Sequence, residues 1–366
     1  YGNTTDLNWM AGSQYVYSFG KCIFMPSDLT AGIEFNQDKL EDNMWGYNRT
    51  VDQKVNIGSA FLQNEWKNDH WGFLIGGRLD KHNLIDHVIF SPRANLRYNP
   101  TENINLRFSY SSGFRAPQAF DEDLHVENVG GNVAMVELAD NLKEERSQSL
   151  SASADIYHRF GAFQVNFLVE GFYTKLSDVF ALTDGEVVDG ILTRTRYNAP
   201  GARVMGLTLE GKMAYLTKFQ LQAGVTLQQS HYSEPHVWNP DAPAVKKMMR
   251  TPNTYGYFTA TYTPIKPLSI ALSGTYTGSM LVHHKPVPGF LEKPITVNTK
   301  DFFDIGLKAA YDFKLYKSMN LQVNAGVQNI FNAYQNDFDK GADRDSGYIY
   351  GPSLPRSFFA GVKISY

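Results

Sequence analysis

The stretch from Met319 to Tyr366 limits the fold of this chain more than any other. In its first part, apolar and amide side chains alternate, with Leu321, Val323, Ala325 and Val327 set between Asn320, Gln322, Asn324 and Gln328. After a long polar loop, apolar residues return at every second position, at Phe358, Ala360, Val362, Ile364 and Tyr366. A period of two is typical of a β-strand with two unlike faces. An apolar outer face, amides on the inner face and a final aromatic favour a transmembrane β-barrel over a soluble sandwich.

Composition agrees with a protein that would cross a membrane by strands. Aromatic residues make up 14% of the chain, with 21 Tyr, and no run approaches the roughly 18 uninterrupted apolar residues that a membrane helix needs. The net charge is -3 and no lysine or arginine stripe is visible, so nucleic acid is not expected as a partner. Cys22 is the one cysteine, which excludes a disulfide framework or a cysteine zinc cluster within the chain.

Short turns and long loops alternate along the chain. About 15 strands are predicted, at 7–19, 29–41, 55–66, 71–80, 88–98, 104–114, 147–157, 163–181, 193–215 with an interruption at 198–201, 219–230, 255–262, 268–280, 302–313, 319–331 and the C-terminal end. Polar loops are expected at 42–53, 115–145, 231–250, 281–300 and 332–356. Outer-membrane barrels place short turns in the periplasm and long loops outside. Because single-chain bacterial barrels have an even number of strands, an odd count and a start at Tyr1 predict that the chain begins inside a larger barrel.

The inner face is expected to be polar. Hydroxyls, amides and a few charges lie opposite apolar residues: Ser149, Ser151, Ser153 and Asp155 on one strand, Thr208, Glu210 and Lys212 on another, and Ser269, Ser273 and Thr275 on a third. Such a lining suits a water-filled pore and a polar plug equally well. A soluble all-β protein is the alternative for any single strand, although soluble sandwiches rarely combine strands this long with loops this one-sided.

Several segments, in order, resemble those of TonB-dependent outer-membrane receptors. They include Ser-Pro-Arg-Ala-Asn-Leu-Arg-Tyr at 91–98, Phe-Ser-Tyr-Ser-Ser-Gly-Phe-Arg-Ala-Pro at 108–117, and the shorter stretches 141–147, 198–201 before 206–210, 250–252, 329–332 and 351–357. The stretch 114–125 is similar to receptors of the Bacteroidetes type. The resemblance implies that residues 1–366 are the C-terminal portion of an all-β, transmembrane antiparallel β-barrel of 22 strands, without the N-terminal plug domain and the first strands.

The same resemblance implies a function and partners. Such receptors sit in the outer membrane of Gram-negative bacteria and bind a scarce, large nutrient at the extracellular mouth. The TonB–ExbB–ExbD complex of the inner membrane then pulls on the plug. A ferric siderophore or another metal chelate is the leading expectation, followed by cobalamin, haem or a glycan, and a surface lipoprotein is a further candidate partner. A passive porin-like channel, which has no plug, is the alternative.

Candidate ligand groups lie on three of the long loops. The first set is Arg115, Asp121, Glu122, Asp123 and His125, the second is His231, Tyr232, His236 and Trp238, and the third is His283 and His284 beside Lys285. Aromatic and cationic side chains suit an anionic, ring-rich siderophore complex. Haem ligation by His125 would need an apolar pocket, whereas its neighbours are acidic. The alternative for the aromatic residues is that they belong to the membrane interface or to loop tips.

Two further chemistries are considered. Asp337, Asp339, Asp343 and Asp345 surround Gly341 with the oxygen-rich spacing of a calcium loop, but without the terminal bidentate Glu of an EF-hand and with Lys340 and Arg344 between them. A solvated turn held by Asp to Arg pairs is the alternative, and no other cofactor is expected. No Gly-x-Ser-x-Gly segment orients a serine toward a base, so an enzyme is not expected.

Overall fold

The computed structural model describes residues 2–45, 49–117, 133–182, 186–188, 191–239, 241–316, 318–341, 343–345 and 347–366. Within these residues the regular secondary structure consists of β-strands. None of the described residues belongs to a helix long and apolar enough to cross a membrane.

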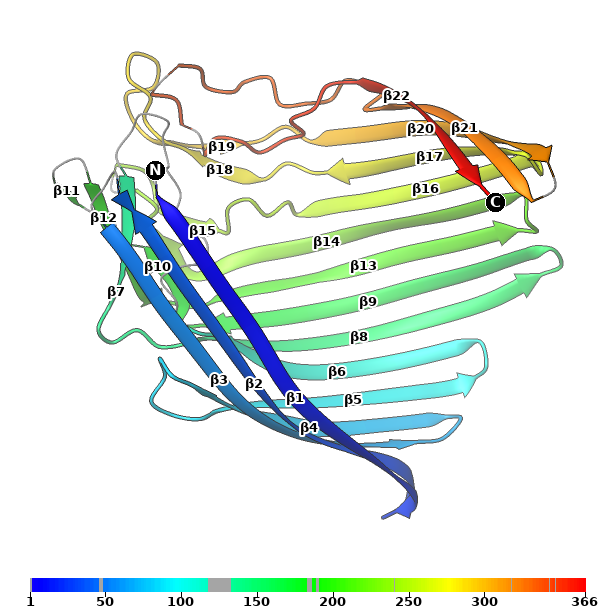
Figure 1. Cartoon of the computed structure of the whole chain (residues 1–366), viewed down its shortest axis with the longest axis horizontal. Helices are drawn as coiled ribbons and strands as arrows, with labels where there is room; N and C mark the ends of the chain where they lie inside the picture. The colour runs from blue at the N-terminus through cyan, green and yellow to red at the C-terminus, as the bar shows by residue number, and fades with distance from the viewer. Residues whose placement is uncertain are drawn as a thin grey trace.

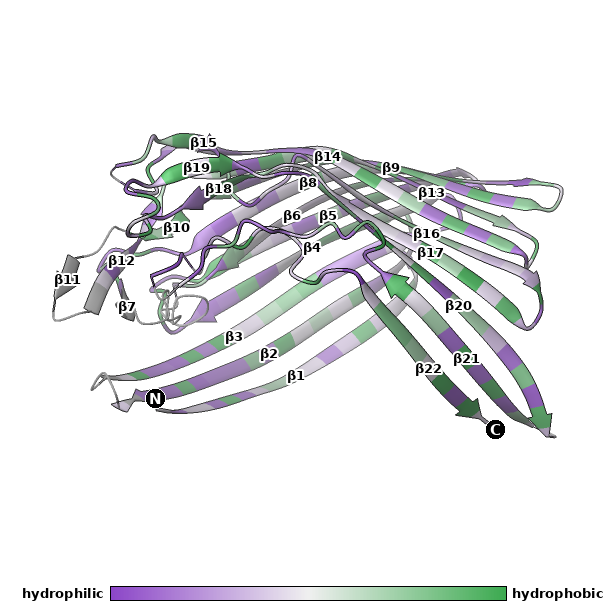
Figure 2. Ribbon diagram, turned by 90° about the horizontal axis from the view of Figure 1, so that it is seen from above, coloured by the Kyte–Doolittle hydropathy of each residue, from purple (hydrophilic) through white to green (hydrophobic). Residues whose placement is uncertain are grey.

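One antiparallel sheet forms most of the molecule (Figure 1). Its strands follow one another in the order of the chain: β1 (Asn3–Cys22), β2 (Met25–Met44), β3 (Arg49–Lys67), β4 (Trp71–His82), β5 (Ile89–Thr101), β6 (Ile104–Arg115), β8 (Glu145–Phe160), β9 (Phe163–Ser177), β13 (Ala202–Tyr215), β14 (Phe219–His236), β16 (Thr254–Ile265), β17 (Leu268–Thr277), β20 (Phe302–Tyr316), β21 (Met319–Gln328) and β22 (Ser357–Ser365). A short strand, β15 (Val245–Lys247), pairs with β14. The sheet curves into an incomplete barrel wall, and its edges β1 and β22 are not paired with each other (Figure 2).

The two faces of the wall differ as the alternation predicts. Hydrophobic and hydrophilic residues alternate along the strands (Figure 2). Val323 lies on the outer face and is 42% exposed, whereas Asn324 donates a hydrogen bond from Nδ2 to the carbonyl oxygen of Gly361 at 3.2 Å. On the inner face, hydroxyl groups pair across strands, as Thr208 does with Thr226 at 3.0 Å. The predicted polar lining of the lumen is therefore confirmed for these strands.

The polar loop predicted at 42–53 is wrong, because β2 extends to Met44 and β3 begins at Arg49. Polar residues continue the ladder there by pairing side chains across strands: Thr4 donates to Asp42 at 2.6 Å and Thr50 donates to Asn43 at 2.8 Å. These strands have 19 or 20 residues, about twice the 9 to 11 that cross a membrane. The first three strands therefore continue beyond the bilayer.

The predicted continuous strand 163–181 is also wrong, since the chain turns out of the wall at Asp178, which has a φ of 55°. β10 (Val179–Leu182) then joins a small sheet with β11 (Glu186–Val188), β12 (Ile191–Ala199) and β7 (Val133–Leu138). The predicted interruption at 198–201 is confirmed, because β12 ends at Ala199 and the wall resumes at Ala202. Gly201 is required at this return, because a Cβ there would collide with the carbonyl oxygen of Leu176.

Long connections gather at one end of the wall, together with the small sheet and a hairpin of β18 (Leu281–His284) and β19 (Ile295–Asn298) (Figure 1). The predicted loop 281–300 thus contains two short strands. The turns at the opposite end are short and bordered by aromatic pairs, such as Trp71 with Tyr98 at 4.2 Å and Phe163 with Tyr215 at 4.6 Å between ring centroids. Aromatic residues at this level are typical of a membrane interface. Because outer-membrane barrels have short turns at the periplasmic end and longer loops outside, the end with the short turns corresponds to the periplasmic end and the loop end to the extracellular mouth.

Candidate ligand-binding site

A cavity of about 670 Å³ opens among the elements of the extracellular mouth. Its walls come from the end of β6, from β10 and β12 of the small sheet, from the upper end of β14 and from β18. Three arginines, a lysine and two histidines line it: Arg115, Arg194, Arg196, Lys285, His236 and His283. Aromatic rings complete the lining at Phe180, Tyr232 and Trp238, and no acidic side chain is among the described residues that line the cavity. The described part of the lining is therefore rich in cationic and aromatic side chains.

Phe180 lies between two guanidinium groups. The Cζ atoms of Arg115 and Arg196 are each 5.6 Å from the centroid of its ring. The backbone N–H of Phe180 donates to Oε2 of Glu145 at 3.0 Å, which ties the ring to the first residue of β8. Arg196 is only 4% exposed. The attraction between a guanidinium and the face of an aromatic ring helps to hold both side chains at this wall of the cavity.

Two contacts between aromatic rings lie on the side of the cavity that is formed by β14, β18 and Trp238. Tyr232 and His236, both on β14, have ring centroids 5.0 Å apart, and Trp238 lies 5.1 Å from His283 of β18. The indole Nε1 of Trp238 is buried and has no hydrogen-bond partner among the residues that the structure describes. An indole N–H is a donor only, and burying it unpaired costs about 1 to 3 kcal/mol. A ligand with an acceptor atom at this position would remove that cost.

The segment 329–356, here named the C-terminal loop, holds β18 in place. Nε2 of His284 lies 2.8 Å from Oδ2 of Asp339, and the His284 ring stacks on Tyr348 at 3.8 Å. The backbone N–H of Lys285 donates to Oδ2 of Asp345 at 2.8 Å. Because His283 and His284 point to opposite sides of β18, fixing His284 in the C-terminal loop directs His283 toward Trp238.

Two tyrosines and a carboxylate complete this support. Tyr348 and Tyr350 donate to Oδ2 of Asp337 at 3.2 and 2.7 Å. Burial and the charge of Asp337 raise the pKa of Tyr348 to about 12, and burial and the hydrogen bond to Asp337 raise that of Tyr350 further. Burial opposes ionisation of Asp337, but hydrogen bonds from Tyr350, Gln335 and Tyr348 outweigh it and lower the pKa of this carboxyl. The cluster therefore keeps one form, with two phenols and one carboxylate, over the physiological pH range.

Five of the residues proposed from the sequence meet in the cavity. These are Arg115, Tyr232, His236, Trp238 and His283. His231 pairs with Lys247 of β15 and is not among the lining residues. His284 does not line the cavity either, because it is buried against Asp339 and Tyr348. Asp121, Glu122, Asp123 and His125 lie outside the described residues. Sequence reasoning missed Phe180, Arg194 and Arg196, although the Thr-Arg-Thr-Arg alternation at 193–196 indicates a strand with one cationic face.

The four aspartates proposed for calcium are used differently. Asp337, Asp339 and Asp345 accept hydrogen bonds from the protein itself, Asp345 is buried, and Asp343 is exposed. Arg344 donates to the carbonyl oxygen of Gly341 at 2.7 Å. Among the residues that the structure describes, no three His, Cys, Asp or Glu side chains form a group that could hold a metal ion. The geometry thus gives the calcium hypothesis no support, and Asp345 is not the solvated residue that the alternative expected.

Comparisons with known proteins agree with the architecture. A family profile described as "TonB dependent receptor-like, beta-barrel" matches residues 1–330. Among solved structures, the chain is similar to a mutant of the ferric enterobactin receptor PfeA from Pseudomonas aeruginosa, with a TM-score of 0.69, 17% identity and coverage of 98% of this chain and 54% of that one. It is also similar to the ferric-catecholate import receptor Fiu from K12 E. coli, with a TM-score of 0.69, 13% identity and coverage of 99% and 55%.

A third similar structure is the siderophore receptor PirA from Acinetobacter baumannii, with a TM-score of 0.69, 16% identity and coverage of 99% of this chain and 55% of that one. At these identities the likeness shows the fold alone. The chain spans about half the length of the solved structures that it matches. A search of curated proteins found no match.

Proposed function

Since this chain belongs to the TonB-dependent receptor-like β-barrel family, we propose that it forms the wall and extracellular mouth of a receptor that takes up a ferric siderophore across the outer membrane. The ligand would be an anionic chelate that carries aromatic rings. Energy would come from the TonB–ExbB–ExbD complex, acting through a plug domain that is not among these residues. Members of the family are outer-membrane proteins of Gram-negative bacteria, and they act as receptors and transporters rather than enzymes.

The cationic and aromatic cavity carries this proposal. Guanidinium groups bind oxyanions through paired N–H donors, and rings such as Trp238 can stack on an aromatic ligand. Cationic side chains in the lining suit an anionic chelate better than a neutral glycan, which would use the rings but carries no charge. The ferric enterobactin and ferric-catecholate receptors named above have this fold, which supports the same class of ligand here.

A passive porin-like channel is the rival function, and transport measurements separate the two. Binding of a ferric catecholate, a ferric hydroxamate, haem and cobalamin is measured on the protein isolated from the outer membrane. Uptake of the same ligands is measured in whole cells, with and without an energised inner membrane. Tight binding and energy-dependent uptake of the catecholate are expected. Energy-independent passage of many small solutes would contradict the proposal and indicate a porin.

A charge variant tests the cavity itself. Arg115→Gln should weaken binding of the ferric catecholate about tenfold or more, because a charge-assisted hydrogen bond contributes about 1.5 to 3 kcal/mol. Arg203→Gln is the matched control, because Arg203 lies on β13 outside the cavity lining. Equal affinity of Arg115→Gln and the control would place the ligand elsewhere.

A further inference from the structure

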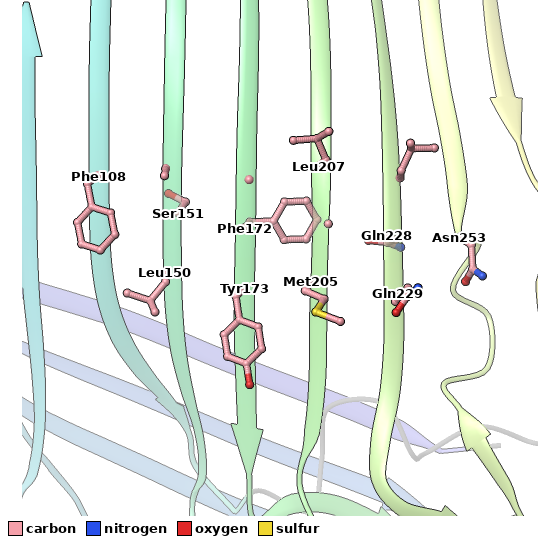
Figure 3. Close-up of a pocket in the computed structure, with 14 residues that line it drawn as sticks. Phe108, Leu150, Ser151, Phe172, Tyr173, Met205, Leu207, Gln228, Gln229 and Asn253 are labelled. Atoms are coloured by element: carbon pink, nitrogen blue, oxygen red, sulfur yellow. The ribbon is translucent and has the colours of Figure 1, made fainter.

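A second hollow lies on the outer face of the wall, away from the mouth. It has a volume of about 800 Å³ and spans β6, β8, β9, β13 and β14. Figure 3 looks onto it, with Phe108, Leu150, Tyr173 and Leu207 standing around its floor on four neighbouring strands. Three of these side chains, Phe108, Leu150 and Leu207, are 38% to 48% exposed. The hollow therefore opens outward, on the face that bears the exposed apolar residues.

The floor is formed by two small residues in one cross-strand row. Ala152 pairs with Phe108 on one side and with Gly171 on the other, and Gly171 pairs with Leu207. A Cβ built on Gly171 would have no atom within 4 Å, so the space above the glycine is open. Large side chains in the next row, Leu150 and Tyr173, rise above the floor on the extracellular side. A groove one side chain deep results.

The depth of the hollow places it within the outer leaflet. Gly171 lies eight residues along β9 from Phe163, whose ring belongs to the aromatic border at the periplasmic end. Eight residues span about 26 Å along a strand, which is about 20 Å along the membrane normal at a tilt of about 40°. The apolar band of such barrels is about 25 Å tall. Gly171 is therefore in the upper part of the band, just below Tyr173.

The chemistry of the lining selects an uncharged, flexible occupant. None of the described lining residues carries a charge, and the polar groups at the upper edge are the amides of Gln229 and Asn253 and the hydroxyl of Tyr173. Such groups can hydrogen-bond an ester or amide carbonyl but supply no cation for a phosphate. We propose that this hollow is a binding site for one acyl chain of an outer-leaflet lipid, held by its chain and its linkage rather than by its headgroup.

Photo-labelling in a defined bilayer tests the site. The protein, purified from the outer membrane with its other domains, is placed in phosphatidylcholine vesicles. These contain about 1 mol% of phosphatidylethanolamine with a diazirine in its palmitoyl chain, and the labelled peptides are identified by mass spectrometry. Labelling is expected to concentrate on the row of Phe108, Ala152 and Leu207. Even labelling over the whole outer face would overturn the proposal.

Variants that fill the hollow sharpen the test. Gly171→Leu should lower labelling of the row about tenfold, because the new side chain displaces about two methylenes of the bound chain. Ala152→Leu fills the same space from β8 and should act alike. Gly211→Leu is the control, because Gly211 lies on β13, also has open space above it and does not line the hollow. Unchanged labelling in both filling variants, with heat-modifiable migration intact, would exclude the site.

A change of the lipid headgroup tests whether the hollow recognises the acyl chain or the headgroup of the lipid. Phosphatidylglycerol with the same diazirine chain should label the row to the same extent as phosphatidylethanolamine, because no charged residue lines the hollow. A difference of about tenfold or more between the two lipids would mean that the headgroup, and not the chain, is recognised, and would overturn the proposal.

Discussion

The barrel wall and the extracellular mouth are held together by different kinds of contact. In the wall, each strand pairs with its neighbour in the sheet through backbone hydrogen bonds, which do not depend on the side chains. In the mouth, single side chains join distant segments: Arg250 donates to the carbonyl oxygen of Ile349 at 2.7 Å, and Asn198 exchanges hydrogen bonds with the backbone of Lys143. In the wall, the effect of a substitution on stability should therefore depend mainly on whether the new side chain has the polarity of its face. In the mouth, it should depend on whether a particular side-chain hydrogen bond is lost.

The largest effect is expected from charge on the outer face. Val323→Arg should destabilise the barrel by about 2 to 4 kcal/mol and impair its assembly, because Val323 faces lipid near the middle of the apolar band. Asn324→Arg, one residue further on, faces the lumen and should be tolerated. The yield of heat-modifiable protein in the outer membrane measures both. Equal tolerance of the two variants would mean that the faces are assigned wrongly.

The next effect concerns the C-terminal loop. Gln335 is 1% exposed, donates to the carbonyl oxygen of Tyr348 at 3.0 Å and accepts from the N–H of Tyr350 at 2.8 Å. Gln335→Ala should loosen this loop by about 1 to 3 kcal/mol, because the two backbone groups are left unpaired. Hydrogen exchange should rise in residues 347–351 and stay unchanged in β20 and β21. Faster exchange in the wall would show that the two regions are not independent.

A smaller, pH-dependent effect is expected at Glu144, just before β8. Burial of this carboxyl opposes ionisation, but hydrogen bonds from Arg146 and His87 outweigh it, so its pKa lies below the usual 4.5. A lowered pKa in the folded state stabilises the mouth above pH 4.5, and this contribution disappears as the pH falls through the lowered value. The protection of residues 139–144, measured as the ratio of the intrinsic to the observed exchange rate at the same pH, should therefore fall below about pH 4.

Glu144→Gln is the control for that experiment. It should remove the pH dependence of this protection and leave residues 139–144 weakly protected at neutral pH as well. If the variant retains the wild-type pH profile, another group controls the stability of this segment.

The smallest effect is expected at Asp343, which is exposed. Asp343→Asn should change the free energy of unfolding by less than about 0.5 kcal/mol, with or without calcium, because the carboxylate faces solvent. Thermal unfolding in calcium and in a chelator measures this. A rise in Tm with calcium that the variant loses would restore the calcium-loop hypothesis.

The wall was predictable from local pattern alone. The period of two located the strands of the main sheet, and turn residues located their connections, because consecutive strands pair with each other and no distant contact has to be known. The errors occurred where a strand leaves the wall or continues past the membrane. At Asp178, the positive φ and the hydrogen bond that its carbonyl accepts from Asn198 depend on a residue twenty positions away.

The candidate site was predictable only in part. Arg115, Trp238 and His283 were selected by residue type on loops, and the structure brings them into one cavity. Phe180 and Arg196 were missed because their role depends on the contact between the ring and the guanidinium. This contact forms only because β10 and β12 pair with each other in the small sheet, outside the barrel wall. The adjacent histidines 283 and 284 could not be told apart by sequence, although only the first faces the cavity.

By itself, the sequence determined the membrane-type β wall, its polar inner face and the end at which the long loops gather. Alternation is a local property, and each residue of a strand obeys it independently of the rest of the chain. Tertiary structure alone decided which cations converge on Phe180, that the acidic C-terminal loop braces β18, and that Ala152 and Gly171 open a hollow on the outer face. These depend on the register between strands and on contacts between distant segments, which no local pattern encodes.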